Sequence, residues 1–349
     1  MADRDLPEPD RFPGAPHPRE RTELFGHDEA EKSFLDAIAA GRLHHAWLIG
    51  GPEGIGKATL AYRVARFLLA HGLRPAASLD VDANHPVSRR VAAQSHPDLA
   101  VIRRGLRADG KAYSAEIRVD DVRRALDLFG ATAGEGGYRV CIVDAADDLN
   151  ASSANALLKL VEEPPPRSIF LIVSHAPQRL LPTVRSRCRR LLLRPLDEKD
   201  LGLVVRSLGP PWAEAEPAAL KEAVALGSGS VRRTLEMLDS DLRSVVAETR
   251  ATLSALPRLD MSRVLALAES LAQRGAEERF RLVLDTAFAW VSARVHQSAA
   301  LGPARLAPLA EVCEKAARAA REVEVFNLDK RPLVIALFGD LADAVRRAG

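Results

Sequence analysis

The stretch Gly51-Pro-Glu-Gly-Ile-Gly-Lys57 decides the fold of this chain. The spacing Gly-x-x-x-x-Gly-Lys places backbone N–H groups around phosphate oxygens, where only glycine permits the close approach, and the lysine neutralises phosphate charge. The next residue should supply a hydroxyl for Mg²⁺, but it is Ala58. Thr59 carries a hydroxyl, yet one position further along a helix it points about 100° away. The candidate nucleotide contacts in this loop are Gly51, Gly54, Gly56, Lys57 and Thr59.

The residues around the loop support this interpretation. A short apolar run precedes it, and apolar residues recur at helical spacing after Lys57. Strand, glycine loop and helix N-terminus in this order form an anion site. From Leu24 to Pro195 short β-branched runs alternate with helical patterns, which predicts an α/β fold with a parallel sheet. The expected strands are Ala46–Ile49, Leu99–Arg103, Arg139–Val143, Ile169–Ser174 and Arg189–Leu193, and the expected helices are Asp28–Ala40, Lys57–His71, Val119–Phe129, Ala151–Glu163 and Pro177–Val184.

Composition sets limits on the class of protein. The chain has 349 residues, of which 47% are hydrophobic, enough for about two or three packed domains. Its net charge of only +2 does not favour a nucleic-acid binder that works through a global field. The three cysteines, Cys141, Cys188 and Cys313, are far apart, so neither a disulfide framework nor a cysteine zinc site is expected. We expect a reduced cytoplasmic protein with no membrane segment, since no apolar run approaches about 18 residues.

The pattern along the chain predicts four segments. Residues 1–21 are rich in proline and charge and are expected to form a disordered tail. The α/β module spans 22–195, a small helical segment follows over 196–239, and residues 240–349 read as helical throughout. Within the module, residues 72–98 look like an irregular insertion. They contain no cysteine, and His85 with His96 cannot complete a tetrahedral zinc site.

A second candidate site residue stands at a strand end. The apolar run Arg139–Val143 leads into Asp144, the form of an acidic residue that holds Mg²⁺ beside a phosphate loop. The following residue normally polarises the attacking water, and here it is Ala145. Two readings of Asp144 stay open, a residual metal role and a carboxylate that caps the next helix. With Ala58 and Ala145 both apolar, we do not expect this chain to hydrolyse nucleotide by itself.

Further motifs carry a family resemblance. They are Gly41-Arg-Leu-His-His-Ala-Trp47, Ala154-Asn-Ala-Leu-Leu-Lys159 with Glu162-Glu-Pro-Pro165, and Ser186-Arg-Cys188. Together with the glycine loop they resemble bacterial DNA polymerase III clamp-loader subunits, which are AAA+ proteins, over roughly residues 22 to 240. A degraded nucleotide site beside an intact Ser-Arg-Cys is similar to the delta prime branch of that family.

The resemblance implies an architecture and a set of roles. It implies an AAA+ P-loop module, a small helical lid over 196–239 and a C-terminal helical collar over 240–349. Arg187 would be an arginine finger that reaches ATP bound by a neighbouring subunit, where its planar guanidinium stabilises transition-state charge. Arg232 falls at the sensor-2 position and Ser174-His175 at the sensor-1 position. On the residues alone, Arg187 is a surface arginine in a basic run and Arg232 is a cation on a helix face.

The function that the resemblance implies is that of a non-hydrolysing clamp-loader subunit of the DNA polymerase III holoenzyme. Its partners would be gamma/tau and delta subunits in a pentameric ring, the sliding clamp, and primer-template DNA through the assembly. No cofactor or zinc is required, and any ATP binding is expected to be weak. Two alternatives stay open, an ATP-hydrolysing motor subunit of gamma/tau type and an autonomous P-loop nucleotide kinase, and Ala58 opposes both. Candidate DNA contacts, for which solvated charge is the alternative, are Arg103, Arg104, Arg123 and Arg124.

Overall fold

The computed structural model describes residues 8–107, 110, 113–130, 137–273, 275–297, 303–326 and 328–348. The chain divides into two compact units, Met1–Leu235 and Glu236–Gly349. Unit 1 holds the sheet, the glycine loop and the first two helices that follow the sheet.

A five-stranded parallel sheet forms the centre of unit 1. Its strands are β1 (Ala46–Gly50), β2 (Leu99–Ile102), β3 (Arg139–Val143), β4 (Ser168–Ser174) and β5 (Arg189–Leu192), in the order β2-β3-β4-β1-β5. In the parallel register, Trp47 pairs with Leu171 and Arg139 pairs with Ser168. Strands β1, β3 and β4 are buried along their whole length, which is why their sequences read as continuous apolar runs. Each expected strand is present, with ends within one residue of the predicted ones.

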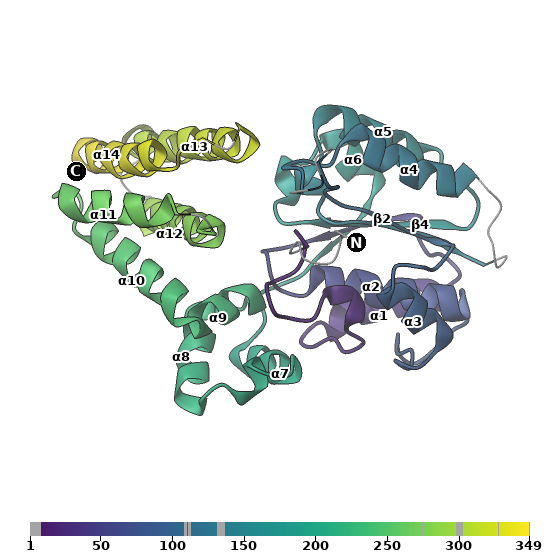
Figure 1. Ribbon diagram of the computed structural model, residues 1–349. Helices are drawn as coiled ribbons and strands as arrows, with labels where there is room; N and C mark the ends of the chain where they lie inside the picture. Colours follow the sequence, from purple (N-terminus) through teal and green to yellow (C-terminus); the bar gives the residue numbers. More distant parts are fainter. Residues whose placement is uncertain are drawn as a thin grey trace. The chain divides into compact units, whose positions relative to one another are not determined.

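Helices cover both faces of this sheet (Figure 1). They are α1 (Asp28–Ala39), α2 (Lys57–His71), α3 (Pro86–Ala92), α4 (Val119–Gly130), α5 (Ala151–Glu162) and α6 (Pro182–Arg187). Helices α1, α2 and α3 lie on one face and α4, α5 and α6 on the other. A hydrophobic core lies on each face of the sheet, and alternate residues of β1 point into one or the other. Trp47 stacks on Phe34 at 4.0 Å between ring centroids on the α1 side, whereas Leu48 belongs to the core on the α5 side. The α/β class predicted from the sequence is confirmed.

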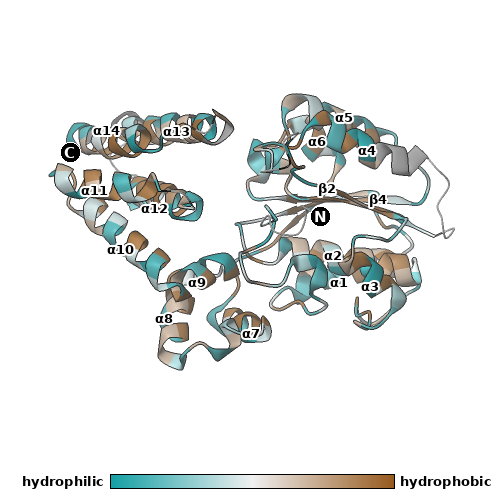
Figure 2. Cartoon of the chain, in the orientation of Figure 1, coloured by the Kyte–Doolittle hydropathy of each residue, from teal (hydrophilic) through white to brown (hydrophobic). Residues whose placement is uncertain are grey.

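The remaining elements are helical. Helices α7 (Glu198–Ser207), α8 (Pro217–Gly227) and α9 (Val231–Leu238) follow the sheet, and α9 begins in unit 1 and ends in unit 2. Unit 2 further contains α10 (Ser240–Ser254), α11 (Met261–Leu271), α12 (Glu277–Gln297), α13 (Pro303–Phe326) and α14 (Arg331–Ala348). Its core includes Val283, Val334 and Phe338, and Figure 2 shows such apolar residues along the helices. None of the helices in the described ranges combines the length and the apolarity needed to cross a bilayer.

Three local predictions need correction. Residues 8–21 do not form a disordered tail, because they contain a 3₁₀ helix at Pro18–Glu20 and His17 is fully buried. The segment 72–98 is not wholly irregular, since it contains α3 and adds Leu79 and Val91 to the core. The predicted helix Pro177–Val184 is two pieces, a 3₁₀ turn at Pro177–Arg179 and then α6, because Pro182 holds the residue before it in an extended conformation.

Candidate functional site

The glycines of the loop adopt conformations that the sequence motif requires. Gly54 and Gly56 have φ values of +75° and +97°, in the region that side chains rarely adopt. A Cβ at Gly54 would lie 2.5 Å from the Ser230 Oγ, and one at Gly51 would lie 2.6 Å from the Leu193 carbonyl oxygen. The loop is therefore closely packed against the segments that follow the sheet, as well as shaped for phosphate.

Lys57 opens α2 and is almost fully buried. Its Nζ donates a hydrogen bond of 2.5 Å to the Pro52 carbonyl oxygen, so the ammonium group folds back onto its own loop. Burial lowers the pKa of Lys57 to about 8, and the nearby carboxylates of Asp144 and Glu53 act in the opposite direction. The lysine is in the position that the motif predicts, and the loop itself satisfies one of its donors.

Asp144 lies at the carboxyl end of β3, facing the loop. Its side chain is buried, and burial together with the nearby Asp10 carboxylate raises the pKa of Asp144 to about 7. The reading of Asp144 as a helix cap is wrong, because Asn150 caps α5 by accepting a hydrogen bond of 2.9 Å from the Ser153 N–H. Asp144 is thus a buried carboxyl group beside the glycine loop.

Asp147 has a role that the sequence analysis did not assign. Its Oδ2 accepts a hydrogen bond of 2.7 Å from the His175 N–H, and its Oδ1 accepts bonds from the Ala176 N–H at 2.9 Å and the Ser174 Oγ at 3.2 Å. These bonds fix the end of β4 beside the loop. Burial lowers the pKa of His175, with the Lys57 charge acting in the same direction. These three accepted hydrogen bonds give Asp147 a structural role at the end of β4.

Arg232, in the first turn of α9, also lies at the loop. Its Nε is 3.4 Å from the Glu53 Oε1, and the side chain is 18% exposed, so it is not a solvated cation on a helix face. The backbone on either side of it is tied to the loop as well: the Ser230 Oγ donates to the Glu53 carbonyl oxygen at 2.9 Å, and the Val231 N–H donates to the Gly54 carbonyl oxygen at 2.8 Å. The start of α9 and the phosphate loop therefore form one bonded unit.

These groups enclose a cavity of about 350 Å³. Its walls include Lys57, Thr59, Asp144, His175 and Arg232, and also both alanines that replace the expected catalytic groups, Ala58 and Ala145. The volume lies at the lower end of the range of small-molecule sites. Part of the wall comes from residues 9–18, which the sequence analysis missed because their polar, proline-rich composition suggested disorder.

The residues present fit a phosphate group and do not fit a catalytic Mg²⁺. The glycine backbone and Lys57 supply donors and positive charge for phosphate. The metal site lacks the hydroxyl expected at Ala58, and the position of the water-activating carboxylate is Ala145, which has no side-chain oxygen. The donors that line this cavity therefore suit an anion.

Arg187 lies elsewhere, at the end of α6, and is not among the residues that line the cavity. Its side chain is 41% exposed, and its Nη2 is 2.8 Å from the Glu162 Oε1 at the end of α5. Its Nη1 donates to the Thr183 carbonyl oxygen at 3.1 Å. The structure thus joins two motifs that are 25 residues apart in sequence, Glu-Glu-Pro-Pro and Ser-Arg-Cys.

The four arginines considered as DNA contacts are paired within the chain. Arg103 binds Glu8 and Asp10, and Arg104 lies 3.3 Å from Asp148. On α4, Arg123 pairs with Asp120 at 3.3 Å, and Arg124 pairs with Asp121. The half-buried pairs of Arg103 and Arg104 favour intramolecular charge pairing over a DNA contact at these two positions.

Comparison with known proteins places this fold and site in a family. The family model described as DNA polymerase III, delta subunit, matches residues 26–197. The delta' subunit of DNA polymerase III from Yersinia pestis is 31% identical over 263 residues, which are 73% of this chain and 73% of that protein. The chain therefore belongs to the family of DNA polymerase III delta' subunits.

Other relatives are matched over shorter fractions of their length. The delta' subunit of Pseudomonas aeruginosa is 38% identical over 187 residues, 53% of this chain and 53% of that protein. The tau subunit of DNA polymerase III from Escherichia coli is 28% identical over 273 residues, 77% of this chain and 41% of that protein. The chain thus spans about half of the first relative and less than half of the second.

Proposed function

We propose that this chain is a non-hydrolysing subunit of the clamp loader of the DNA polymerase III holoenzyme. One observation carries the proposal: the degraded nucleotide site and the exposed Arg187 occur in the same module at different places. Ala58 and Ala145 line the cavity of the chain itself, whereas Arg187 extends from the end of α6. A subunit that cannot cleave ATP but presents an arginine is suited to assist a neighbour that can.

In this proposal Arg187 stabilises charge on the phosphate of ATP bound by an adjacent gamma/tau subunit. Its exposure and its weak surface pairing with Glu162 leave the guanidinium able to contact another chain, because a surface ion pair is worth only about 0–1 kcal/mol. The partners are gamma/tau and delta subunits in a pentameric ring, together with the sliding clamp and primer-template DNA. We place the assembly in the cytoplasm.

The chain needs no cofactor of its own in this proposal, and ATP binds it weakly at most. Zinc is not required. The histidines of the 72–98 segment have structural contacts: the Nδ1 of His85 accepts a hydrogen bond from the Val87 N–H at 3.2 Å, and that of His96 accepts one from the Asp98 N–H at 3.1 Å. These bonds support a role in helix capping and turn formation.

The second candidate is an ATP-hydrolysing motor subunit, which the similarity to tau subunits supports. ATPase assays separate the two candidates. The purified chain alone is expected to show no turnover, whereas motor chemistry of this kind runs at about 1 s⁻¹ or faster. The same preparation mixed with gamma/tau and delta subunits is expected to enter a stable complex on size-exclusion chromatography. Turnover by the isolated chain, or failure to join those subunits, would contradict the proposal.

A further inference from the structure

Residues 8–18, here called the strap, form part of the wall of the P-loop cavity. The strap residues that line the cavity are Pro9, Asp10, Phe12, Ala15, Pro16 and Pro18. Most of the strap is half-buried, but Ala15 and His17 are buried and the Asp10 side chain is only 7% exposed. A carboxylate that is buried to this degree must be held by specific partners, because isolated buried charges are strongly disfavoured.

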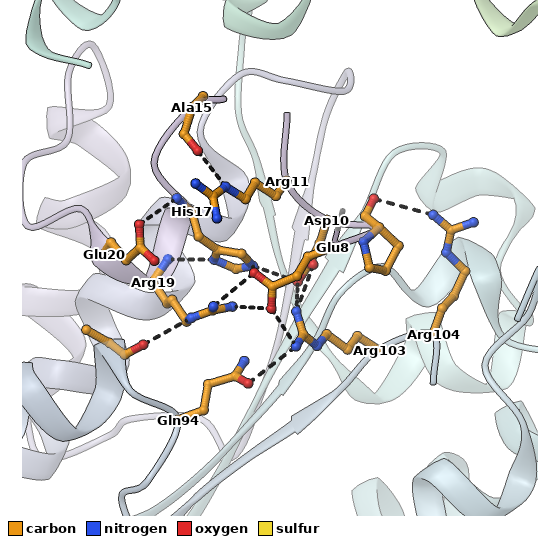
Figure 3. Close-up of polar contacts among 12 residues, drawn as sticks. Glu8, Asp10, Arg11, Ala15, His17, Arg19, Glu20, Gln94, Arg103 and Arg104 are labelled. Atoms are coloured by element: carbon orange, nitrogen blue, oxygen red, sulfur yellow. Dashed lines mark hydrogen bonds and ion pairs between the residues drawn. The ribbon is translucent and has the colours of Figure 1, made fainter. Parts of the chain in front are cut away.

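Charged residues latch one end of the strap (Figure 3). Arg103, just after β2, donates from Nη2 to the Glu8 Oε1 at 2.8 Å and from Nη1 to the Asp10 Oδ1 at 2.9 Å. Arg19 binds the other face of Glu8, with its Nη2 2.9 Å from Oε2, and the His17 Nε2 lies 3.0 Å from the Asp10 Oδ2. Figure 3 shows the side chains converging on Arg103. Two arginines just after β2 hold the first residues of the strap to the sheet, because the Arg104 Nη2 also donates a hydrogen bond to the Pro9 carbonyl oxygen at 3.4 Å.

An aromatic contact anchors the middle of the strap. The ring of Phe12 packs edge-on against Trp212 at 5.7 Å between centroids, and the guanidinium of Arg232 lies 5.7 Å from the same ring. Glu53 holds the Nε side of Arg232, and the Pro52 carbonyl oxygen holds Lys57. Both cations that could contact a bound phosphate are thus engaged by groups of the chain itself, and the strap supplies one of those groups.

The strap also changes the charge of the site. It adds the Asp10 carboxylate to the wall of the cavity that Asp144 also lines. A nucleoside polyphosphate that entered with the strap in place would lie close to both carboxyl groups. The site also lacks the Ser or Thr hydroxyl that normally helps to hold a metal ion, which would neutralise this negative charge. Because the cavity remains large enough for a small ligand, the closed strap opposes binding through the charge of Asp10 and through the contact of Phe12 with Arg232, rather than by filling the space.

We propose that the strap is an internal gate: closed, it keeps nucleoside di- and triphosphates off the phosphate loop, and ligand binding and strap closure exclude each other. The inference does not depend on the clamp-loader assignment, because it concerns only groups within unit 1. Ligand affinity is then reduced by the fraction of molecules in which the strap is open.

The first test is binding of a fluorescent ADP analogue, followed by anisotropy, to the full chain and to Arg103→Met. This variant removes a positive charge, so tighter binding cannot come from added electrostatic attraction. We expect the apparent affinity to rise by about tenfold or more as the latch opens. Arg123→Met is the matched control, since it removes an arginine of the same charge from an exposed pair on α4 and should leave binding unchanged. Phe12→Ala should act like Arg103→Met, with folding of each variant checked by circular dichroism.

The second test uses the reciprocity of linked equilibria. A ligand that binds only the open form must increase the open population, so ADP should accelerate trypsin cleavage after Arg11, within the strap. If the strap were instead a wall that completes the nucleotide site, ADP would slow this cleavage and both variants would bind more weakly. That result would overturn the proposal, and so would unchanged or absent binding in the folded Arg103→Met and Phe12→Ala chains.

Discussion

The Glu162 carboxylate and the Arg187 guanidinium lie 2.8 Å apart, so the end of α5 holds the arginine at the end of α6. Both side chains are partly exposed, at 38% and 41%. The pair is therefore a surface ion pair and contributes little to stability. What it provides is orientation, because Arg187 is a long side chain and the Thr183 carbonyl oxygen and Glu162 fix two of its nitrogens.

Substitution of Glu162 by glutamine tests this orientation. Glu162→Gln should change the free energy of unfolding by less than about 0.5 kcal/mol, as for most surface pairs. Hydrolysis at the one site that Arg187 serves should fall by about two- to tenfold, the cost of re-ordering one long side chain, and total loader ATPase should fall less than in Arg187→Ala. Glu163→Gln, which alters the neighbouring exposed carboxylate, should leave both quantities unchanged. Equal ATPase in the Glu162 variant and the wild type would show that the pair has no positioning role, whatever the result for Arg187 itself.

Gly54 tests the packing of the phosphate loop against the start of α9. Gly54→Ala should destabilise unit 1 by about 2 kcal/mol or more in urea unfolding, because the new Cβ meets both an unfavourable φ and the Ser230 Oγ at 2.5 Å. Gly41→Ala is the matched control: φ is +63° there, but no atom lies within 4 Å of the added Cβ. It should show the backbone penalty alone. Equal losses in the two variants would mean that the loop does not depend on this contact.

The raised pKa of Asp144 predicts that the free energy of unfolding depends on pH. Its pKa is raised from 3.8 to about 7 by burial, so the folded state binds more protons than the unfolded state between these values. The contribution of Asp144 to stability is therefore fully present below about pH 4 and is lost as pH rises through about 7. Asp144→Asn, which stays neutral, should raise the free energy of unfolding by on the order of 2 kcal/mol at pH 8 and have little effect at pH 4. Exposed Asp120 supplies the control, as Asp120→Asn should show no such difference.

Much of unit 1 could be predicted from sequence, for physical reasons. The central strands are buried on both faces, so their apolar runs are continuous, and the glycine spacing around Lys57 reflects a backbone that only glycine can adopt. The helix after Lys57 was predicted with its exact bounds because its apolar period is unbroken.

The strap and the Glu162–Arg187 pair could not be predicted in this way. The strap is polar and rich in proline, and it is held by distant partners, since Arg103, nearly 100 residues away, binds Glu8 and Asp10, and Trp212 packs against Phe12. The composition of a segment indicates its average tendency to be ordered or disordered, and it carries no information about such distant partners. Similarly, the contact between Glu162 and Arg187 arises because α5 and α6 lie side by side, which no local pattern specifies.

The most direct test of the central claim is the ATPase of a reconstituted loader that carries Arg187→Ala. We expect the variant to fold and assemble, because truncation of a partly exposed side chain leaves no cavity. Clamp- and DNA-stimulated hydrolysis should fall partially, since one neighbouring site loses a contribution of about 10³ to 10⁵ in rate while the others keep theirs. Arg187→Lys should rescue poorly, because an ammonium group lacks the planar fork, and Arg190→Ala on the exposed edge strand should behave as wild type. Unchanged hydrolysis and clamp loading in the Arg187→Ala complex would contradict the account.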